Sequence, residues 1–168
     1  MFELKKLPPE AIAHALEKAE RYRLLKEPYE AESICEDILS VDPENQQALI
    51  ILLLALTDKF DRKLSAAFAK AKAVLERLSD RYCKAYYRGV VFERRAKTHL
   101  KSDQPGAGQV AYEWLVKAMN AYEEALTFCN PDNQDAVLRW NTCARIINET
   151  PHVSPPSDDR REEMLDTY

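Results

Sequence analysis

An uninterrupted run of nine apolar residues, from Ala48 to Leu56, most constrains what this chain can fold into. A helix of this length rises about 13 Å, whereas a membrane span needs roughly 20 apolar residues. We therefore expect no membrane span from this run. A helix that is apolar on all sides belongs in the interior of a helical assembly or against a partner.

The composition favours an all-α protein. Only three glycines occur in 168 residues, and a sheet protein needs many more for its turns. Hydrophobic residues make up 46% of the chain, enough for a substantial core. The net charge is −4 with both signs interspersed, so a nucleic-acid binder is not expected.

Apolar residues recur at the i, i+3, i+4 spacing of helices that bury one face. Together with proline and asparagine breaks, the spacing predicts about seven helices, over residues 9–26, 29–41, 46–59, 63–79, 81–100, 110–129 and 134–149. The glycine-containing stretch 101–109 is predicted to be a loop. Residues 150–168 are rich in proline and charge and are predicted to form a flexible or docked tail.

The helix pairs repeat at a near-constant interval. In each unit a small or mid-sized residue precedes a large apolar one by three positions. These pairs are Ala19 and Tyr22, then Leu53 and Leu56 at 34 residues further on, then Gly89 and Phe92 after another 36 residues. The turn VDPENQQAL recurs as CNPDNQDAV. A helix pair with a period near 34 residues is typical of tetratricopeptide repeats.

The stretch AERYRLLKEPYEAESICEDILSVDPENQQAL resembles a tetratricopeptide repeat. The matching positions are Ala19, Tyr22, Ala31 and Pro43 in the first unit, and Gly89, Phe92, Ala118, Tyr122, Ala125 and Pro131 in the third. The second unit departs from the family, because Leu53 stands where a small residue is usual. The resemblance implies a right-handed helix-turn-helix solenoid over residues 1–149, with units 10–45, 46–80 and 81–133 and a capping helix 134–149.

The resemblance also places several residues on the concave face of the stack, where members of the family bind peptides. These residues are Leu16, Ile50, Ile51, Leu54, Tyr86, Tyr87, Val90, Arg94 and Arg145. They predict an apolar, tyrosine-bearing groove for a peptide or helix of another protein. The charged rim is predicted to consist of Glu17, Glu20, Arg23, Glu93 and Arg94. Two alternatives are burial of these residues in the core and occupation of the groove by the chain's own tail.

Three classes of function remain. The first is a protein-interaction module: a scaffold, an adaptor or a co-chaperone-like protein. The second is homo-oligomerisation through the same apolar face. The third and least favoured is nucleic-acid binding through the basic stretch 94–101. Some members of the family hold acidic C-terminal tails with lysines and asparagines, but this chain has Leu16, Glu20 and Ile51 at those positions, so that clamp is not expected.

The sequence predicts no enzyme. No metal-ligand motif, phosphate-binding loop or nucleophile motif occurs, and we expect no metal and no cofactor. The four cysteines, Cys35, Cys83, Cys129 and Cys143, stand far apart within helical patterns and are expected to be free thiols. No signal peptide is recognised at the start, and a cytoplasmic location is predicted.

Overall fold

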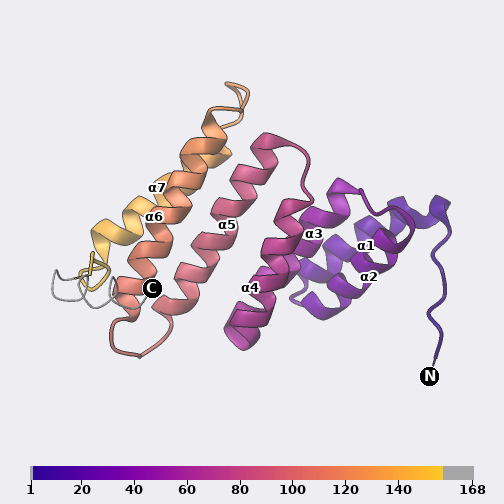
Figure 1. Ribbon diagram of the computed structural model, residues 1–168, viewed down its shortest axis with the longest axis horizontal. Helices are drawn as coiled ribbons and strands as arrows, with labels where there is room; N and C mark the ends of the chain where they lie inside the picture. The colour runs from indigo at the N-terminus through magenta and orange to yellow at the C-terminus, as the bar shows by residue number, and fades with distance from the viewer. Residues whose placement is uncertain (1, 157–168) are drawn as a thin grey trace.

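The computed structural model describes residues 2–156, and within them it contains helices, turns and short connections but no strand. This confirms the predicted all-α class. In chain order the elements are a 3₁₀ turn, η1 (Pro9–Ala11), and the helices α1 (Ile12–Leu24), α2 (Pro28–Val41), α3 (Gln46–Thr57), α4 (Phe60–Glu76), α5 (Arg81–Leu100), α6 (Ala107–Leu126) and α7 (Asp135–Glu149) (Figure 1).

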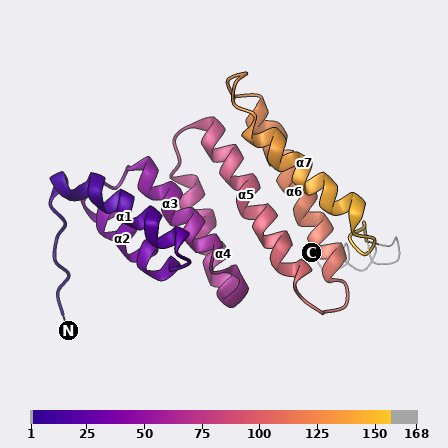
Figure 2. The same cartoon turned by 180° about the vertical axis from the view of Figure 1, so that it is seen from behind.

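The helices lie in a row that runs from α1 and α2 at one end to α6 and α7 at the other (Figure 1; Figure 2 from behind). Each helix packs against the next one in the chain, and contacts also join α1 to α3, α3 to α5, and α5 to α7. The odd-numbered helices therefore form a continuous layer. Neighbouring pairs cover the apolar faces that one pair alone leaves exposed.

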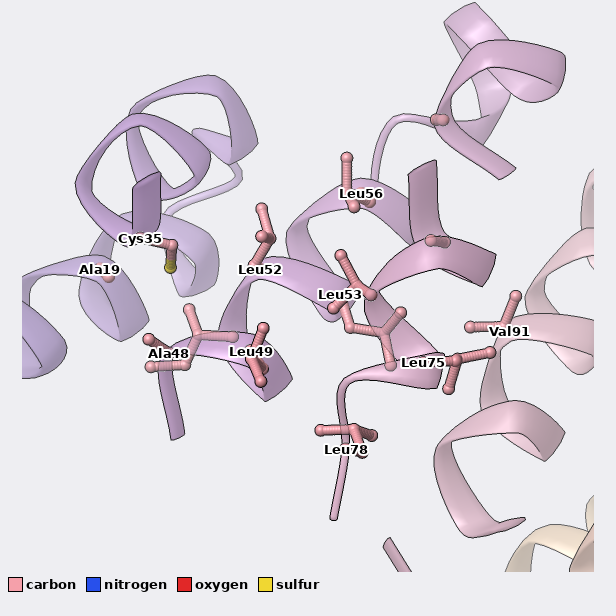
Figure 3. Packing of buried hydrophobic residues seen from close by; sticks show 14 of the residues in the cluster. Ala19, Cys35, Ala48, Leu49, Leu52, Leu53, Leu56, Leu75, Leu78 and Val91 are labelled. Carbon is pink, nitrogen blue, oxygen red and sulfur yellow. The ribbon is translucent and has the colours of Figure 1, made fainter. Parts of the chain in front are cut away.

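The apolar run forms most of α3, which contacts α1 and α2 on one side and α4 and α5 on the other. Ala19 and Cys35 lie on the first side, and Leu75 and Val91 on the second (Figure 3). Leu53 of α3 is fully buried between them. The run is apolar all round because helices surround it.

Side-chain caps begin two of the odd-numbered helices. The Asn45 side chain accepts a hydrogen bond from the Ala48 N–H (2.9 Å), and Asp80 accepts one from the Cys83 N–H (2.7 Å). Such caps satisfy backbone donors that the first helical turn leaves unpaired. α5 begins directly after Asp80 and covers the predicted range.

α4 begins earlier than the apolar pattern predicts. Phe60 opens the helix, is buried and packs edge-on against Phe68 with 6.1 Å between the ring centres. Lys63, the predicted start, has φ −143° and ψ 51°, which interrupts the helical geometry. The residues around Phe60 are charged, so this first turn shows no apolar periodicity in the sequence.

A second apolar cluster joins α5, α6 and α7. Val153, which follows α7, is buried in it. The described start of the predicted tail is therefore docked, and residues 157–168 lie outside the described part. Membership of the tetratricopeptide family and the right-handed sense of the stack stay predictions.

We predict that the protein loses stability in alkali through two buried thiols. Burial raises the pKa values of Cys35 and Cys143 from 9.0 to about 12, with the charge of nearby glutamates as a further cause. Because the folded-state pKa is the higher one, the stabilising contribution is complete below about pH 9 and is lost as the pH rises toward 12. Each thiol then lowers the free energy of unfolding by about 1.4 kcal/mol per pH unit.

Urea unfolding at several pH values above 8 is the measurement. The variant carrying Cys35→Ala and Cys143→Ala is expected to lose stability less steeply than the unaltered chain. Parallel declines of the two proteins would contradict the prediction.

Candidate functional site

The predicted groove residues all lie on the layer of odd-numbered helices. Leu16 is on α1, Ile50, Ile51 and Leu54 are on α3, Tyr86, Tyr87, Val90 and Arg94 are on α5, and Arg145 is on α7. Leu16, Ile51 and Val90 are buried in the core. Their side chains support this layer from within and are not accessible at its surface.

Four of the predicted residues form a half-buried band across α3 and α5, which we call the Leu54 strip: Ile50, Leu54, Tyr86 and Tyr87. Leu54 of α3 packs against the cluster that α5, α6 and α7 share. The Tyr86 ring lies 5.1 Å from the Tyr87 ring, nearly perpendicular to it. Burial raises the pKa of the Tyr87 hydroxyl, which therefore remains protonated and able to donate a hydrogen bond.

Glu93 is buried, so its predicted place on the rim of the groove is wrong. Its side chain has 0% exposure and accepts hydrogen bonds from the Tyr122 hydroxyl (2.6 Å), Lys97 (2.5 Å) and Arg139 (3.0 Å). Burial and the negative charge of Glu93 raise the pKa of Tyr122. The carboxylate thus holds α5, α6 and α7 together.

The two predicted arginines differ in their surroundings. Arg94 donates a hydrogen bond to the Thr57 hydroxyl (2.6 Å) and forms an ion pair with Asp58, both at the end of α3. Arg94 also reaches the carbonyl of Leu54 at 3.5 Å. Arg145 is exposed on α7. The structure therefore joins Arg94 to the Leu54 strip and leaves Arg145 at the end of the row.

A pocket of about 720 Å³ opens beside Arg94, at the edge where α1, α3 and α5 end. We call it the α1–α3–α5 pocket. It is lined by Arg23, Leu24, Lys26, Glu27, Pro28, Tyr29, Glu30, Thr57, Asp58, Lys59, Asp61, Arg62, Arg94, Lys97, Thr98 and Lys101. The C-terminal ends of α1, α3 and α5 carry partial negative charge, which favours cations, whereas the first turns of α2 and α4, which also line the pocket, favour anions.

Lys59 forms one wall of the pocket and is almost fully buried. Its ammonium group pairs with Glu32 and lies 4.1 Å from the centre of the Tyr29 ring. Burial lowers the pKa of Lys59, and the nearby Lys70 and Lys63 charges lower it further. These contacts fix Lys59 as part of the pocket wall.

The basic stretch 94–101 is engaged within the chain. Arg95 is packed between the rings of Phe68 and Trp114, at 4.0 and 4.1 Å from their centres. Lys97 pairs with Glu93, and Lys101 pairs with Asp61 (2.7 Å). Because these cations have partners, the structure gives no support to a phosphate-binding face on α5.

The residues of the Leu54 strip and Arg94 were predicted from the sequence, but the α1–α3–α5 pocket was not. Its lining comes from helix ends and turns that are far apart in the chain, such as Lys26, Asp58 and Lys101. Charged residues at such positions have no periodic pattern and look like solvated surface. The exposed Leu24, followed by Leu25 at the end of a helix, was the one local signal of an apolar surface there.

Residues 2–156 contain neither a candidate metal site nor a candidate membrane span. In this part of the chain, no three histidine, cysteine, aspartate or glutamate side chains converge in an arrangement that holds a metal ion. None of the helices described is both long and apolar enough to cross a membrane.

No model of a known protein family, no curated protein and no solved structure matches this chain.

Proposed function

We propose that this chain is a protein-interaction module that binds a segment of another protein along α1, α3 and α5, with the α1–α3–α5 pocket as its anchor point. The observation that carries the proposal is the pocket itself. Its volume of about 720 Å³ falls within the range of about 300–1,000 Å³ typical of binding sites. Five helices, α1 to α5, contribute to it from three successive helix pairs, as expected for a scaffold or adaptor built from repeats.

Two observations on neighbouring residues support the proposal. The pocket has an apolar side, where Leu24 and Tyr29 are 67% and 42% exposed. Its other side begins at Arg94, which contacts the carbonyl of Leu54 and so connects the pocket to the Leu54 strip. An apolar anchor beside hydrogen-bonding and charged groups is the usual composition of a peptide site.

We further propose that the helices form a tetratricopeptide-like stack. In this proposal the protein has no catalytic activity and acts in the cytoplasm. All four cysteines are free thiols, and Cys35 and Cys143 are buried, as is usual in reducing compartments.

Selection from a random peptide display library tests the function directly. We expect peptides that bind the unaltered chain and lose most of their affinity for Leu24→Glu, because a carboxylate would enter the apolar side of the pocket. Leu138→Glu is the matched control, since Leu138 is 63% exposed on α7 and does not line the pocket.

The control variant should bind the selected peptides as the unaltered chain does. Circular dichroism of each variant checks that the helices remain. A selection that yields no binding peptide, or peptides equally sensitive to both substitutions, would contradict the proposed function.

A further inference from the structure

Arg95 is packed against aromatic rings without an anionic partner. Its guanidinium group lies 4.0 Å and 4.1 Å from the ring centres of Phe68 and Trp114. Its Nε atom is buried and has no hydrogen-bond partner, and within residues 2–156 no carboxylate forms an ion pair with it. The rings hold the guanidinium group in place but carry no net charge. Its positive charge is therefore not neutralised, which is costly for a group partly removed from water.

The uncompensated charge also affects a neighbouring residue. Burial lowers the pKa of Arg95, because the charged form is poorly solvated there. Burial and the charge of Arg95 together lower the pKa of His99, one turn further along α5. The Nε2 atom of His99 is likewise buried without a hydrogen-bond partner. An anionic group at this place would stabilise the charged form of Arg95.

Two lysines lie over the same rings. The ammonium group of Lys72 on α4 lies 5.2 Å from the centre of the Phe68 ring, and that of Lys117 on α6 lies 4.4 Å from the centre of the Trp114 ring. Both lysines are exposed, and neither has an ion pair in the described part of the chain. We call these five residues the Arg95 face. It extends across α5, which lies between α4 and α6 (Figure 1), and its two rings are 5.4 Å apart.

The carboxylates on the three helices do not balance this face. Glu76 of α4 pairs with Lys84 at 3.1 Å, and Glu124 of α6 pairs with Arg88. Glu113 of α6, four residues before the lysine of that helix, has no ion pair among the residues described. If Glu113 offsets one of the three cations, the charge of the other two remains. The face thus attracts an anionic group.

The chain contains a segment of the opposite charge. Residues 157–168, with the sequence SDDRREEMLDTY, carry five carboxylate side chains and two arginines. Met164 and Leu165 add apolar groups to this segment. Such groups match the Trp114 ring and Val110, which is 38% exposed one turn earlier on α6. The segment therefore complements the Arg95 face in charge and in apolar character.

The described chain also ends close enough for this segment to reach the face. After α7 the chain passes directly over the first turn of α6, because a Cβ atom at position 108 would lie 2.1 Å from the His152 carbonyl oxygen. Val153 is buried in the cluster of α5, α6 and α7. From Gly108 to Lys117 the helix rises about 14 Å, whereas twelve extended residues span up to about 40 Å.

We infer that residues 157–168 bind to the Arg95 face of the same chain, where their carboxylates pair with Arg95, Lys72 and Lys117. The inference does not rest on the proposed function, because no residue of this face lines the α1–α3–α5 pocket. Binding gives Arg95 the counter-ion that residues 2–156 do not supply. A tethered segment acts at a high effective concentration, so pairs that are individually weak suffice.

Carbodiimide cross-linking of the full chain, followed by mass spectrometry of its peptides, tests the contact. The reagent joins a carboxylate to a lysine amine without a spacer, so it reports groups that touch. We expect cross-links from residues 157–168 to Lys72 or Lys117, in a yield that is unchanged on dilution and falls as salt is raised. Cross-links that are equally frequent at Lys18, which is exposed on α1, would overturn the inference. A yield that falls on dilution would assign the contact to a second copy and would also overturn it.

Cleavage by trypsin after Arg160 and Arg161 provides a second measurement on the full chain. In the variant carrying Lys72→Glu and Lys117→Glu we expect cleavage there to be about tenfold faster, because two ion pairs are replaced by repulsion. The segment itself is unaltered, so the intrinsic susceptibility of its bonds to trypsin stays the same.

The matched control carries Lys18→Glu and Arg21→Glu, which are exposed on α1 and change the net charge by the same amount. It should be cleaved in the segment at the rate of the unaltered chain, and circular dichroism checks that both variants keep their helices. Equal rates in all three proteins, or equal acceleration in both variants, would overturn the inference and leave the proposed function intact.

Discussion

Gly89→Ala is expected to lower the free energy of unfolding by about 2 kcal/mol, although alanine is the better helix former. On propensity alone, the substitution in the middle of α5 would stabilise the protein by about 1 kcal/mol. A Cβ atom at position 89, however, would lie 2.6 Å from Cδ1 of Tyr122, well inside van der Waals contact. Forcing a methyl group into a packed core costs about 1–3 kcal/mol.

The Tyr122 ring has little room to move. It is fully buried, and its hydroxyl is held by Glu93 at 2.6 Å. Any displacement of the ring also weakens this hydrogen bond, which adds about 1 kcal/mol to the cost. Steric and polar losses therefore act together and exceed the gain in helix propensity.

Urea unfolding followed by far-ultraviolet circular dichroism measures the effect. The same substitution in a Tyr122→Leu background is the control, because the shorter side chain removes the obstructing ring. There we expect Gly89→Ala to be neutral or slightly stabilising, so the two backgrounds should differ by more than 1 kcal/mol, roughly the scale of coupling between residues in contact. The same cost in both backgrounds would refute the steric explanation.

Glu93→Leu is expected to lower the free energy of unfolding by about 3 kcal/mol. The substitution leaves the buried Tyr122 hydroxyl without its acceptor and removes the partner that Lys97 and Arg139 share. The two cations are only partly buried and can turn toward water, so the orphaned hydroxyl accounts for a large share of the loss.

A second substitution separates these contributions. Glu93→Leu combined with Tyr122→Phe removes the orphaned hydroxyl and is expected to recover about 1–2 kcal/mol. Urea unfolding of both variants is the measurement. If adding Tyr122→Phe lowered stability further, the hydroxyl would not be the costly group, and the account of this carboxylate would be wrong.

The predicted groove shows where sequence reasoning about a site stops. Ile50, Leu54, Tyr86 and Tyr87 were placed on a common face because the resemblance to tetratricopeptide repeats assigns their positions to the concave side of the stack. Such a resemblance does not say how closely two helices approach. Ile51, which lies beside Ile50 in the chain, is buried. Its burial depends on the distance between α3 and the neighbouring helices.

Glu93 shows a related limit. A glutamate in a helix with several charged neighbours has the sequence signature of a solvated rim. Its burial depends on Tyr122 of α6 and Arg139 of α7, which are remote in the chain and supply the hydrogen bonds that make a buried carboxylate tolerable. The α1–α3–α5 pocket is likewise assembled from the ends of separate elements.

The sequence by itself determined the helices, their order and the interior position of the apolar run, because helix formation and amphipathic patterning are local and periodic. Tertiary structure alone decided which polar groups are buried and that a pocket exists. These features depend on distances between helix ends, which packing of whole helices sets and no single segment encodes.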